Sequence, residues 1–111
     1  MLKRSKGNPI PQSIRLLVYE REGGRCFRCG MRGSEMSHRR PRGIRDGLEH
    51  AAFNILLFCR TCHVWLHANT KMAHAGGWAV SRYEADPSTI PALRWDGVLV
   101  YLTEGGGYRS A

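Results

Sequence analysis

Apolar side chains recur at helical spacing in two stretches of this chain. In residues 12–22 they fall on one side of a helix, with Ser13 near the start and Gly23 directly after the last turn. This pattern predicts an amphipathic helix over 12–22, with Ser13 as its N-cap and Gly23 as its stop. A similar pattern predicts a second helix over residues 61–69. The apolar positions are Ile14, Leu17 and Val18 in the first helix and Val64, Leu66 and Ala68 in the second.

The rest of the pattern favours extended chain and turns. Residues 35–38 alternate weakly between polar and apolar and predict a strand, whereas the apolar run 54–58 predicts a buried connector. Two β-rich stretches follow, at 78–83 and 98–102, and Trp-Asp-Gly at 95–97 is typical of a hairpin turn.

The chain length and texture indicate one domain in three parts. With 111 residues the protein has room for about one domain, and a core of that size is marginal. We expect a mobile basic arm at 1–11, a main segment at 12–75, and a β-rich extension of the same domain at 76–111. The glycines at 105–107 predict a flexible tail.

Two short-spaced cysteine pairs are the strongest chemical signal in the chain. Cys26 and Cys29 form the first pair, Cys59 and Cys62 the second. Together they can supply four thiolates to one tetrahedral zinc ion, which would make up for a small core. Two disulfides are the alternative, but the N-terminus has no apolar segment behind its basic residues as a secretory leader would. We therefore expect a reduced, cytoplasmic protein with a structural Zn²⁺.

Charge narrows the class of partner. The sequence has 17 Lys+Arg against 9 Asp+Glu, a formal net charge of +8. This excess draws a protein toward polyanions through counterion release from phosphates. The longest apolar run, residues 55–59, is far shorter than the roughly 20 residues that span a bilayer. Nucleic acid is therefore the expected partner, and a membrane is not.

Over residues 12–70 the chain resembles the zinc-stapled HNH endonucleases. The shared elements, in chain order, are Cys26-x-x-Cys29, His38, Asn54 and Cys59-x-x-Cys62-His63. The run Ser-His-Arg-Arg-Pro-Arg-Gly at 37–43 and the Gly-Gly-Trp at 76–78 are similar to the small HNH proteins of bacteriophages that infect actinobacteria. The resemblance implies an α+β fold with a ββα-metal (His-Me finger) core, stapled by the four-Cys zinc site and flanked by an N-terminal helix and a small C-terminal β extension. It also implies metal-dependent cleavage of double-stranded DNA, in the host cytoplasm if a phage encodes the protein.

The residues between and after the cysteine pairs would carry this chemistry. Phosphodiester hydrolysis needs a deprotonated water and a cation that offsets charge on the phosphate. A neutral imidazole suits the first task, so His38 is the candidate general base. By the resemblance, Asn54 would hold the loop and orient His38. His63 would bind a catalytic divalent ion, Mg²⁺, Mn²⁺, Ni²⁺ or Zn²⁺, distinct from the structural zinc.

The second ligand of that catalytic ion is a departure from the family pattern. Many relatives carry Asp or His directly before the base, whereas this chain has Ser37, whose hydroxyl is a poorer ligand for a hard cation. His67 lies four residues after His63 on the same helix face and is the candidate that compensates. We interpret His50 and His74 as bystanders.

A dense basic run follows the proposed base. Guanidinium groups match phosphate oxygens well, so we expect these arginines to contact DNA, a solvated charge run being the alternative. The run consists of Arg39, Arg40, Arg42 and Arg45. Two other functions stay open: a zinc-ribbon module that binds DNA without cleaving it, and an accessory protein whose main partner is a phage terminase large subunit in DNA packaging.

Overall fold

The computed structural model describes residues 9–41, 43–44 and 46–111. Its first element, the helix α1 (Gln12–Glu22), has the bounds that the sequence predicts. Ser13 is not the N-cap, however. Pro11 occupies that position without a side-chain hydrogen bond, because its fixed φ, here −58°, already leads the chain into the helix. The helix ends as predicted at Gly23, whose φ of 64° is the left-handed conformation that closes many helices.

A two-stranded hairpin follows α1. The strand β1 (Glu35–His38) pairs antiparallel with β2 (Ile55–Phe58), so that Glu35 faces Phe58 and His38 faces Ile55. A long loop and the short 3₁₀ helix η1 (Ala52–Asn54) connect the two strands. All four residues of β2 are buried, so the predicted connector is a core strand. A continuous apolar run of this length is typical of a strand covered on both faces.

Two helices follow the hairpin. α2 (Arg60–Ala68) confirms the second predicted helix to within one residue. α3 (Thr70–Ala75) was not predicted from the sequence; it begins after Asn69, whose φ of −133° and ψ of 60° turn the chain between the two helices. In the part of the chain that the structure describes, no helix has the length and apolar character needed to cross a membrane.

The C-terminal part of the chain forms a second sheet. After the 3₁₀ helix η2 (Pro87–Thr89), the strands β3 (Ala92–Leu93), β4 (Leu99–Leu102) and β5 (Tyr108–Ser110) pair antiparallel in the order β3-β4-β5. The turn predicted at 95–97 joins β3 to β4, and the Gly97 N–H donates to the Arg94 carbonyl across it. The β-rich stretch predicted at 98–102 is confirmed as the strand β4.

Two predictions for this C-terminal part are wrong. Residues 78–83 form no strand, because the backbone N–H groups of Trp78 and Ala79 both donate to the carbonyl of Ala73 and hold the chain against the end of α3. Residues 105–107 are not a flexible tail. The Thr103 N–H donates to the Gly107 carbonyl and closes the turn between β4 and β5.

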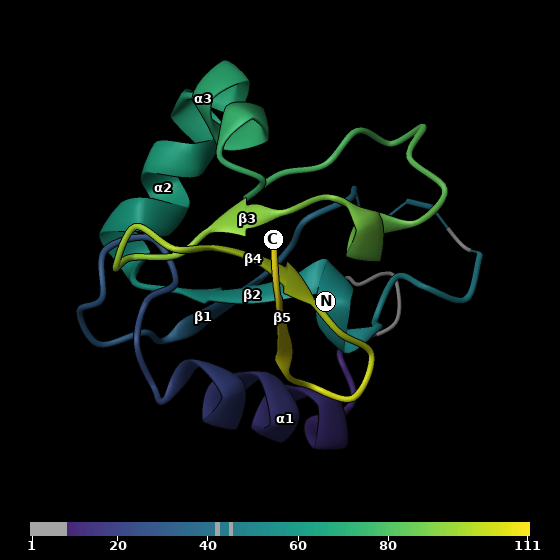
Figure 1. Ribbon diagram of the computed structural model, residues 1–111, viewed down its shortest axis with the longest axis horizontal. Helices are drawn as coiled ribbons and strands as arrows, with labels where there is room; N and C mark the ends of the chain where they lie inside the picture. The colour runs from purple at the N-terminus through teal and green to yellow at the C-terminus, as the bar shows by residue number, and fades with distance from the viewer. Residues whose placement is uncertain (1–8, 42, 45) are drawn as a thin grey trace, which may run out of the picture.

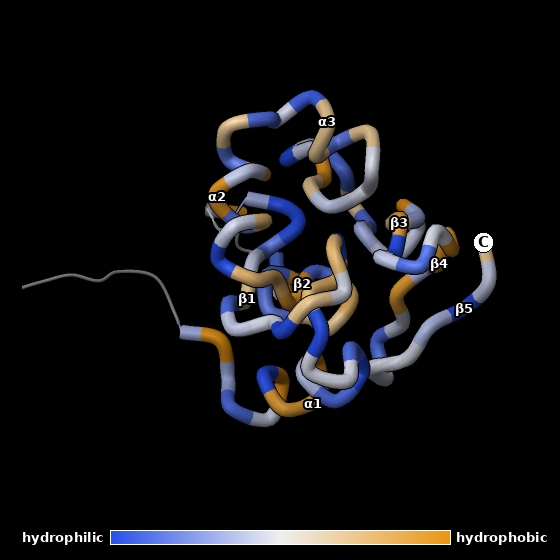
Figure 2. Tube along the Cα trace, turned by 90° about the vertical axis from the view of Figure 1, so that its left-hand side faces the viewer, coloured by the Kyte–Doolittle hydropathy of each residue, from blue (hydrophilic) through white to orange (hydrophobic). Residues whose placement is uncertain are grey.

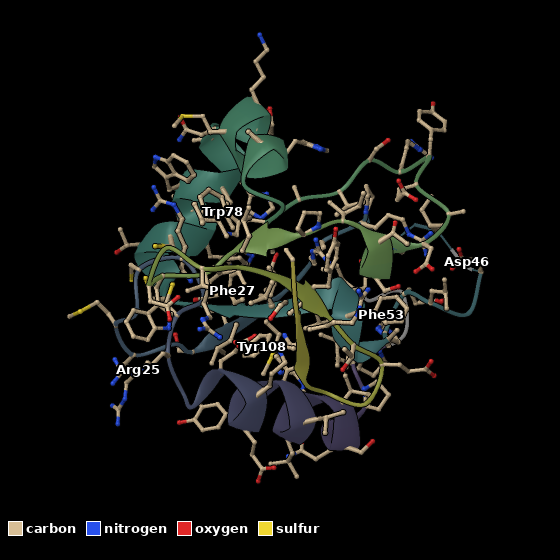
Figure 3. All side chains as sticks on the ribbon, in the orientation of Figure 1. Arg25, Phe27, Asp46, Phe53, Trp78 and Tyr108 are labelled. Atoms are coloured by element: carbon tan, nitrogen blue, oxygen red, sulfur yellow. The ribbon has the colours of Figure 1, made fainter. Side chains whose placement is uncertain are left out.

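β2 lies at the centre of the molecule. Figure 1 shows α1 below the hairpin and β3 and β4 above it, and Figure 2 shows the apolar β2 between α1 and the other elements. Two apolar clusters therefore meet on β2. The first contains Ile10, Val18, Ile55 and Leu57; the second includes Phe27, Phe53, Leu56, Phe58, Leu66, Val100 and Leu102. Figure 3 shows Phe27 and Phe53 of this second cluster on the left and right of the core. The C-terminal sheet thus completes the core.

Candidate functional site

Four cysteine side chains converge where β2 leads into α2. The Sγ atoms of Cys26, Cys29, Cys59 and Cys62 all lie within 4.8 Å of one another, and those of Cys29 and Cys59 are 3.7 Å apart. Four sulfurs bound to one zinc at about 2.3 Å would be about 3.8 Å from each other. The four thiols are free, which contradicts the disulfide alternative. The predicted cysteines are therefore positioned to bind one metal ion.

Backbone turns position the two cysteine pairs. In the first, the Gly30 N–H donates to the Cys26 carbonyl at 2.9 Å, and Gly30 has the positive φ of 80° that this turn needs. In the second, the Cys59 sulfur caps α2 by accepting from the Cys62 N–H at 3.4 Å. A Cβ on Gly30 would meet the ring of Trp95 at 3.0 Å, so the β3–β4 turn packs directly on the first pair.

An arginine faces the sulfurs from inside the first pair. The guanidinium of Arg28 donates to the Cys62 sulfur at 3.4 Å and lies 3.6 Å from the ring centroid of Trp65. Burial raises the pKa of the Cys62 thiol to about 12. A bound metal would hold this sulfur as the thiolate, and Arg28 supplies positive charge beside it. Trp65 and Trp78, whose ring centroids are 6.0 Å apart, are partly buried and pack against the core.

His63 is held by a carboxylate that the sequence analysis missed. Its Nδ1 lies 2.7 Å from Oε1 of Glu35, the first residue of β1, and Oε2 of Glu35 accepts from Arg60 at 3.2 Å. The hydrogen bond to His63 lowers the pKa of the Glu35 carboxyl. Glu35 and His63 are far apart in the sequence, and only the register of β1 against β2 brings them together. This contact could have been predicted only from the pairing register of β1 and β2.

His67 and Ser37 lie near this pair. The rings of His63 and His67 have centroids 5.0 Å apart, as expected for residues four apart on a helix. Ser37 is on the same face of β1 as Glu35, because side chains two apart in a strand share a face. Among the residues that the structure describes, however, the four cysteines are the one group of three or more His, Cys, Asp or Glu side chains close enough to hold an ion. The predicted roles of His67 and Ser37 as ligands stay predictions.

His38 contacts a second histidine. Its Nε2 is 3.1 Å from Nδ1 of His50, and the two rings have centroids 5.2 Å apart. His50 therefore contacts the candidate base, and its interpretation as a bystander in the reaction stays a prediction. Strand alternation places the side chain of His38 on the face of β1 opposite to Glu35 and Ser37. The candidate base, His38, therefore lies on one face of β1. Glu35, which contacts the candidate metal ligand His63, lies on the other face.

Asn54 fastens the loop between the strands. Its buried side chain accepts from the Arg40 N–H at 2.9 Å and donates to the Glu49 carbonyl at 3.0 Å. These two backbone groups lie two residues after His38 and one residue before His50. The side chain of Asn54 therefore ties together the chain segments that carry both histidines.

The predicted role of Arg39 and Arg40 in phosphate contact is wrong, because both side chains are used inside the protein. They are 2% and 1% exposed. Burial lowers the pKa of Arg39 to about 10. Arg40 donates to the carboxylate of Asp46 at 2.7 Å, at the outer edge of the loop (Figure 3), and to the Glu84 carbonyl at 2.8 Å. The guanidinium of Arg39 donates to the carbonyl oxygens of Phe53, Gly77, Pro87 and Ile90. Arg42 and Arg45 lie outside the described residues.

Comparison with known proteins adds no relative: no family model matches the sequence, and neither curated proteins nor solved structures give a significant match. The resemblance to HNH endonucleases stays a prediction that rests on the motif. The site itself then supplies the physical arguments about function.

Proposed function

We propose that this protein is a metal-dependent DNA endonuclease of the HNH type, with Zn²⁺ in the four-cysteine site as its structural ion. It would hydrolyse phosphodiester bonds of double-stranded DNA with low sequence specificity, cutting one strand at each active site. The formal net charge of +8 supports a polyanionic substrate. The four thiolates support zinc, which prefers a closed tetrahedral set of sulfurs.

The contact between Glu35 and His63 carries the proposal. It holds α2, which carries the expected metal ligand His63, against β1, which carries the expected base His38. The contact is made by Glu35, three residues before His38. A carboxylate on Nδ1 of a histidine fixes the ring and makes Nε2 the ligand atom, an arrangement common around protein-bound metals. His63 is therefore prepared to bind a cation through Nε2.

Each residue would have a separate task in the reaction. His63 would bind the divalent cation, which supplies positive charge opposite the phosphate and the departing 3′-oxygen. His38 would take the proton from the attacking water. Asn54 would keep the loop in place beside His38, and Ser37 and His67 are the nearest candidates for further contacts to the cation.

The scissile phosphate has to be reached from both faces of β1. Glu35 and His38 are three residues apart in the strand, so their side chains leave opposite faces. His63 contacts Glu35 at the first residue of the strand, whereas His38 is its last residue. The proposal therefore requires DNA that reaches His38 and the cation on His63 around β1.

Plasmid nicking tests the function directly. Purified protein is incubated with supercoiled plasmid and Mg²⁺, Mn²⁺ or Ni²⁺, and conversion to nicked circles is measured. Loss of a general base lowers a rate by about 10²–10⁴-fold, so His38→Ala should abolish detectable nicking. The matched control is His74→Ala, which removes an exposed histidine on α3 and should nick like wild type. Full activity of His38→Ala would overturn the assignment of the base.

A zinc-ribbon module that binds DNA without cutting it is the second candidate. Two observations favour it. The four cysteines are the one group of side chains among the described residues that is positioned to bind a metal ion, and Ser37 is a neutral residue. This candidate predicts DNA retention in a salt-dependent gel shift and no nicking by wild type with any of the three ions. Nicking that requires His38 excludes it.

A further inference from the structure

Two arginines lie opposite each other where the first cysteine turn leads toward β1. Arg25 and Arg32 are partners in an isolated antiparallel β-bridge. Backbone hydrogen bonds flank this pair on both sides, at 2.6 Å from the Cys26 N–H to the Met31 carbonyl and at 2.8 Å from the Gly33 N–H to the Gly24 carbonyl. This is the pattern of a non-hydrogen-bonded pair, in which opposite side chains lie closest, with Cβ atoms about 4.5–5.5 Å apart.

The protein does not offset the repulsion between these two charges. Both arginines are exposed, and neither is in an ion pair with any residue that the structure describes. Like charges directly opposite each other destabilise an antiparallel pair. Phosphate groups bound to the two side chains would replace this repulsion with attraction.

The ring of Trp95 orients one of the two guanidinium groups. The Arg25 guanidinium lies 5.0 Å from the ring centroid of Trp95, and its Nη1 donates to the Gly30 carbonyl at 3.1 Å. A guanidinium has five N–H donors, so Arg25 keeps others for a ligand. Trp95 is 43% exposed, and Figure 3 shows Arg25 at the outer edge of the molecule. The oriented guanidinium is therefore open to a partner outside the protein.

We propose that Arg25 and Arg32 bind phosphates of the DNA backbone, and that Trp95 is the residue that positions Arg25. Guanidinium groups bind phosphate oxygens through paired, charge-assisted hydrogen bonds. Arg32 is three residues before Glu35, which contacts His63, so the arginine pair lies next to the end of β1 at which the proposed cation would bind. These phosphates would belong to the DNA that flanks the scissile bond. The inference rests on the proposed function for its ligand, DNA, but not on cleavage.

The salt dependence of DNA binding tests the arginine pair. Zinc-loaded protein is titrated into a fluorescent DNA duplex at a series of salt concentrations, with no added divalent ion. Each lost phosphate contact should lower the slope of log K against log salt concentration by about 0.9. We expect this change in both Arg25→Gln and Arg32→Gln, which corresponds to an affinity loss of about eightfold at 0.1 M salt. The matched control is Arg109→Gln, which also removes an exposed arginine beside an aromatic ring and should bind like wild type.

Trp95→Leu keeps the net charge and tests the positioning. Since Arg25 would lose its aromatic partner, we expect the affinity for DNA to fall about 2–5-fold, the magnitude of an exposed cation–π contact. In the Arg25→Gln background the same substitution should change nothing, because no guanidinium is left to position. An equal loss in both backgrounds would show that Trp95 contacts DNA by itself and would overturn its positioning role.

Two results would overturn the phosphate contacts. One is a wild-type slope for Arg25→Gln and Arg32→Gln, in variants that bind zinc fully and melt no lower than wild type. The other is an equal fall of the slope in Arg109→Gln, since net charge alone would then set the affinity.

The plasmid assay separates this inference from the nuclease function. A wild type that binds DNA with an arginine-dependent slope but does not nick overturns the nuclease and leaves the arginine pair supported. Nicking by a wild type whose slope depends on neither Arg25 nor Arg32 overturns the arginine pair alone.

Discussion

Replacing Gly77 with alanine tests how closely the C-terminal segment is fitted to the rest of the protein. Gly77 has a φ of 77°, and a Cβ there would lie 2.0 Å from the carbonyl oxygen of Pro91. Gly97 has almost the same backbone, with a φ of 84°, but no atom lies within 4 Å of its Cβ position. The two alanine variants share the backbone strain and differ in the clash.

The structure gives the expected magnitudes. A left-handed conformation costs a non-glycine residue about 1–2 kcal/mol, and both variants carry this cost. The neighbours of Gly77 cannot move freely, because its carbonyl accepts from Arg39 at 2.9 Å and the Gly76 carbonyl accepts from Leu93 at 2.9 Å. Forcing atoms into a packed interior adds about 1–3 kcal/mol. We therefore expect Gly97→Ala to lower the free energy of unfolding by about 1–2 kcal/mol and Gly77→Ala by about 2–5 kcal/mol.

Urea unfolding of the zinc-loaded variants, followed by tryptophan fluorescence, measures this difference. For a domain of this size each kcal/mol also lowers the melting temperature by about 4–8 °C, which gives a second readout. An equal loss of stability in the two variants would refute the argument, since it would mean that the contact with Pro91 relaxes at no cost. A wild-type melting temperature for Gly97→Ala would refute the shared strain.

Three further predictions concern the metal, the acid range and a buried hydrogen bond. Removing the zinc with a strong chelator should unfold the protein, as loss of far-UV circular dichroism, because the metal site supports a small core; persistence of the native spectrum in metal-free protein would contradict this. Because the pKa of Glu35 is lowered by His63, its carboxylate contributes stability above its ordinary pKa, and the contribution is lost as the pH falls through the lowered value. Glu35→Gln should therefore lose stability less steeply in that acid range, in urea titrations at a series of pH values, and a slope equal to that of wild type would exclude the contact. Tyr108→Phe removes the hydroxyl that donates to the Glu22 carboxylate, whose side chain is 2% exposed, and should cost about 1.5–3 kcal/mol of unfolding free energy in the same assay. No measurable loss would show that Glu22 finds another partner.

Local sequence patterns predicted the elements whose own residues decide their conformation. The helix α1 follows from apolar spacing and a terminal glycine, and the turn at 95–97 follows from Gly97. The cysteine set could be predicted for a similar reason, since each pair is a short turn. Only the approach of the two pairs to each other depends on the fold. It could still be predicted, because one zinc ion needs four ligands.

The errors arose where distant backbone decides the environment of a side chain. Arg39 looks like one more residue of a basic run, but the carbonyl groups that bury it lie 14 to 51 residues away. Glu35 and His50 have no local signal either, since each gains its partner from a strand register or from the closure of a loop. Patterns of periodicity and spacing contain none of this information, because it depends on which segments pack together.

The guanidinium of Arg39 has a consequence for how this gene product can be divided. Three of its four acceptors, the carbonyls of Gly77, Pro87 and Ile90, belong to the segment after residue 75. A shortened protein that ends at residue 75 would retain every cysteine and histidine of the motif. The buried guanidinium of Arg39 would then lose three of its four hydrogen-bond acceptors. Recombination that transferred the motif into another protein without residues 76–111 would leave Arg39 in the same state. The motif and the 76–111 segment therefore have to be inherited together.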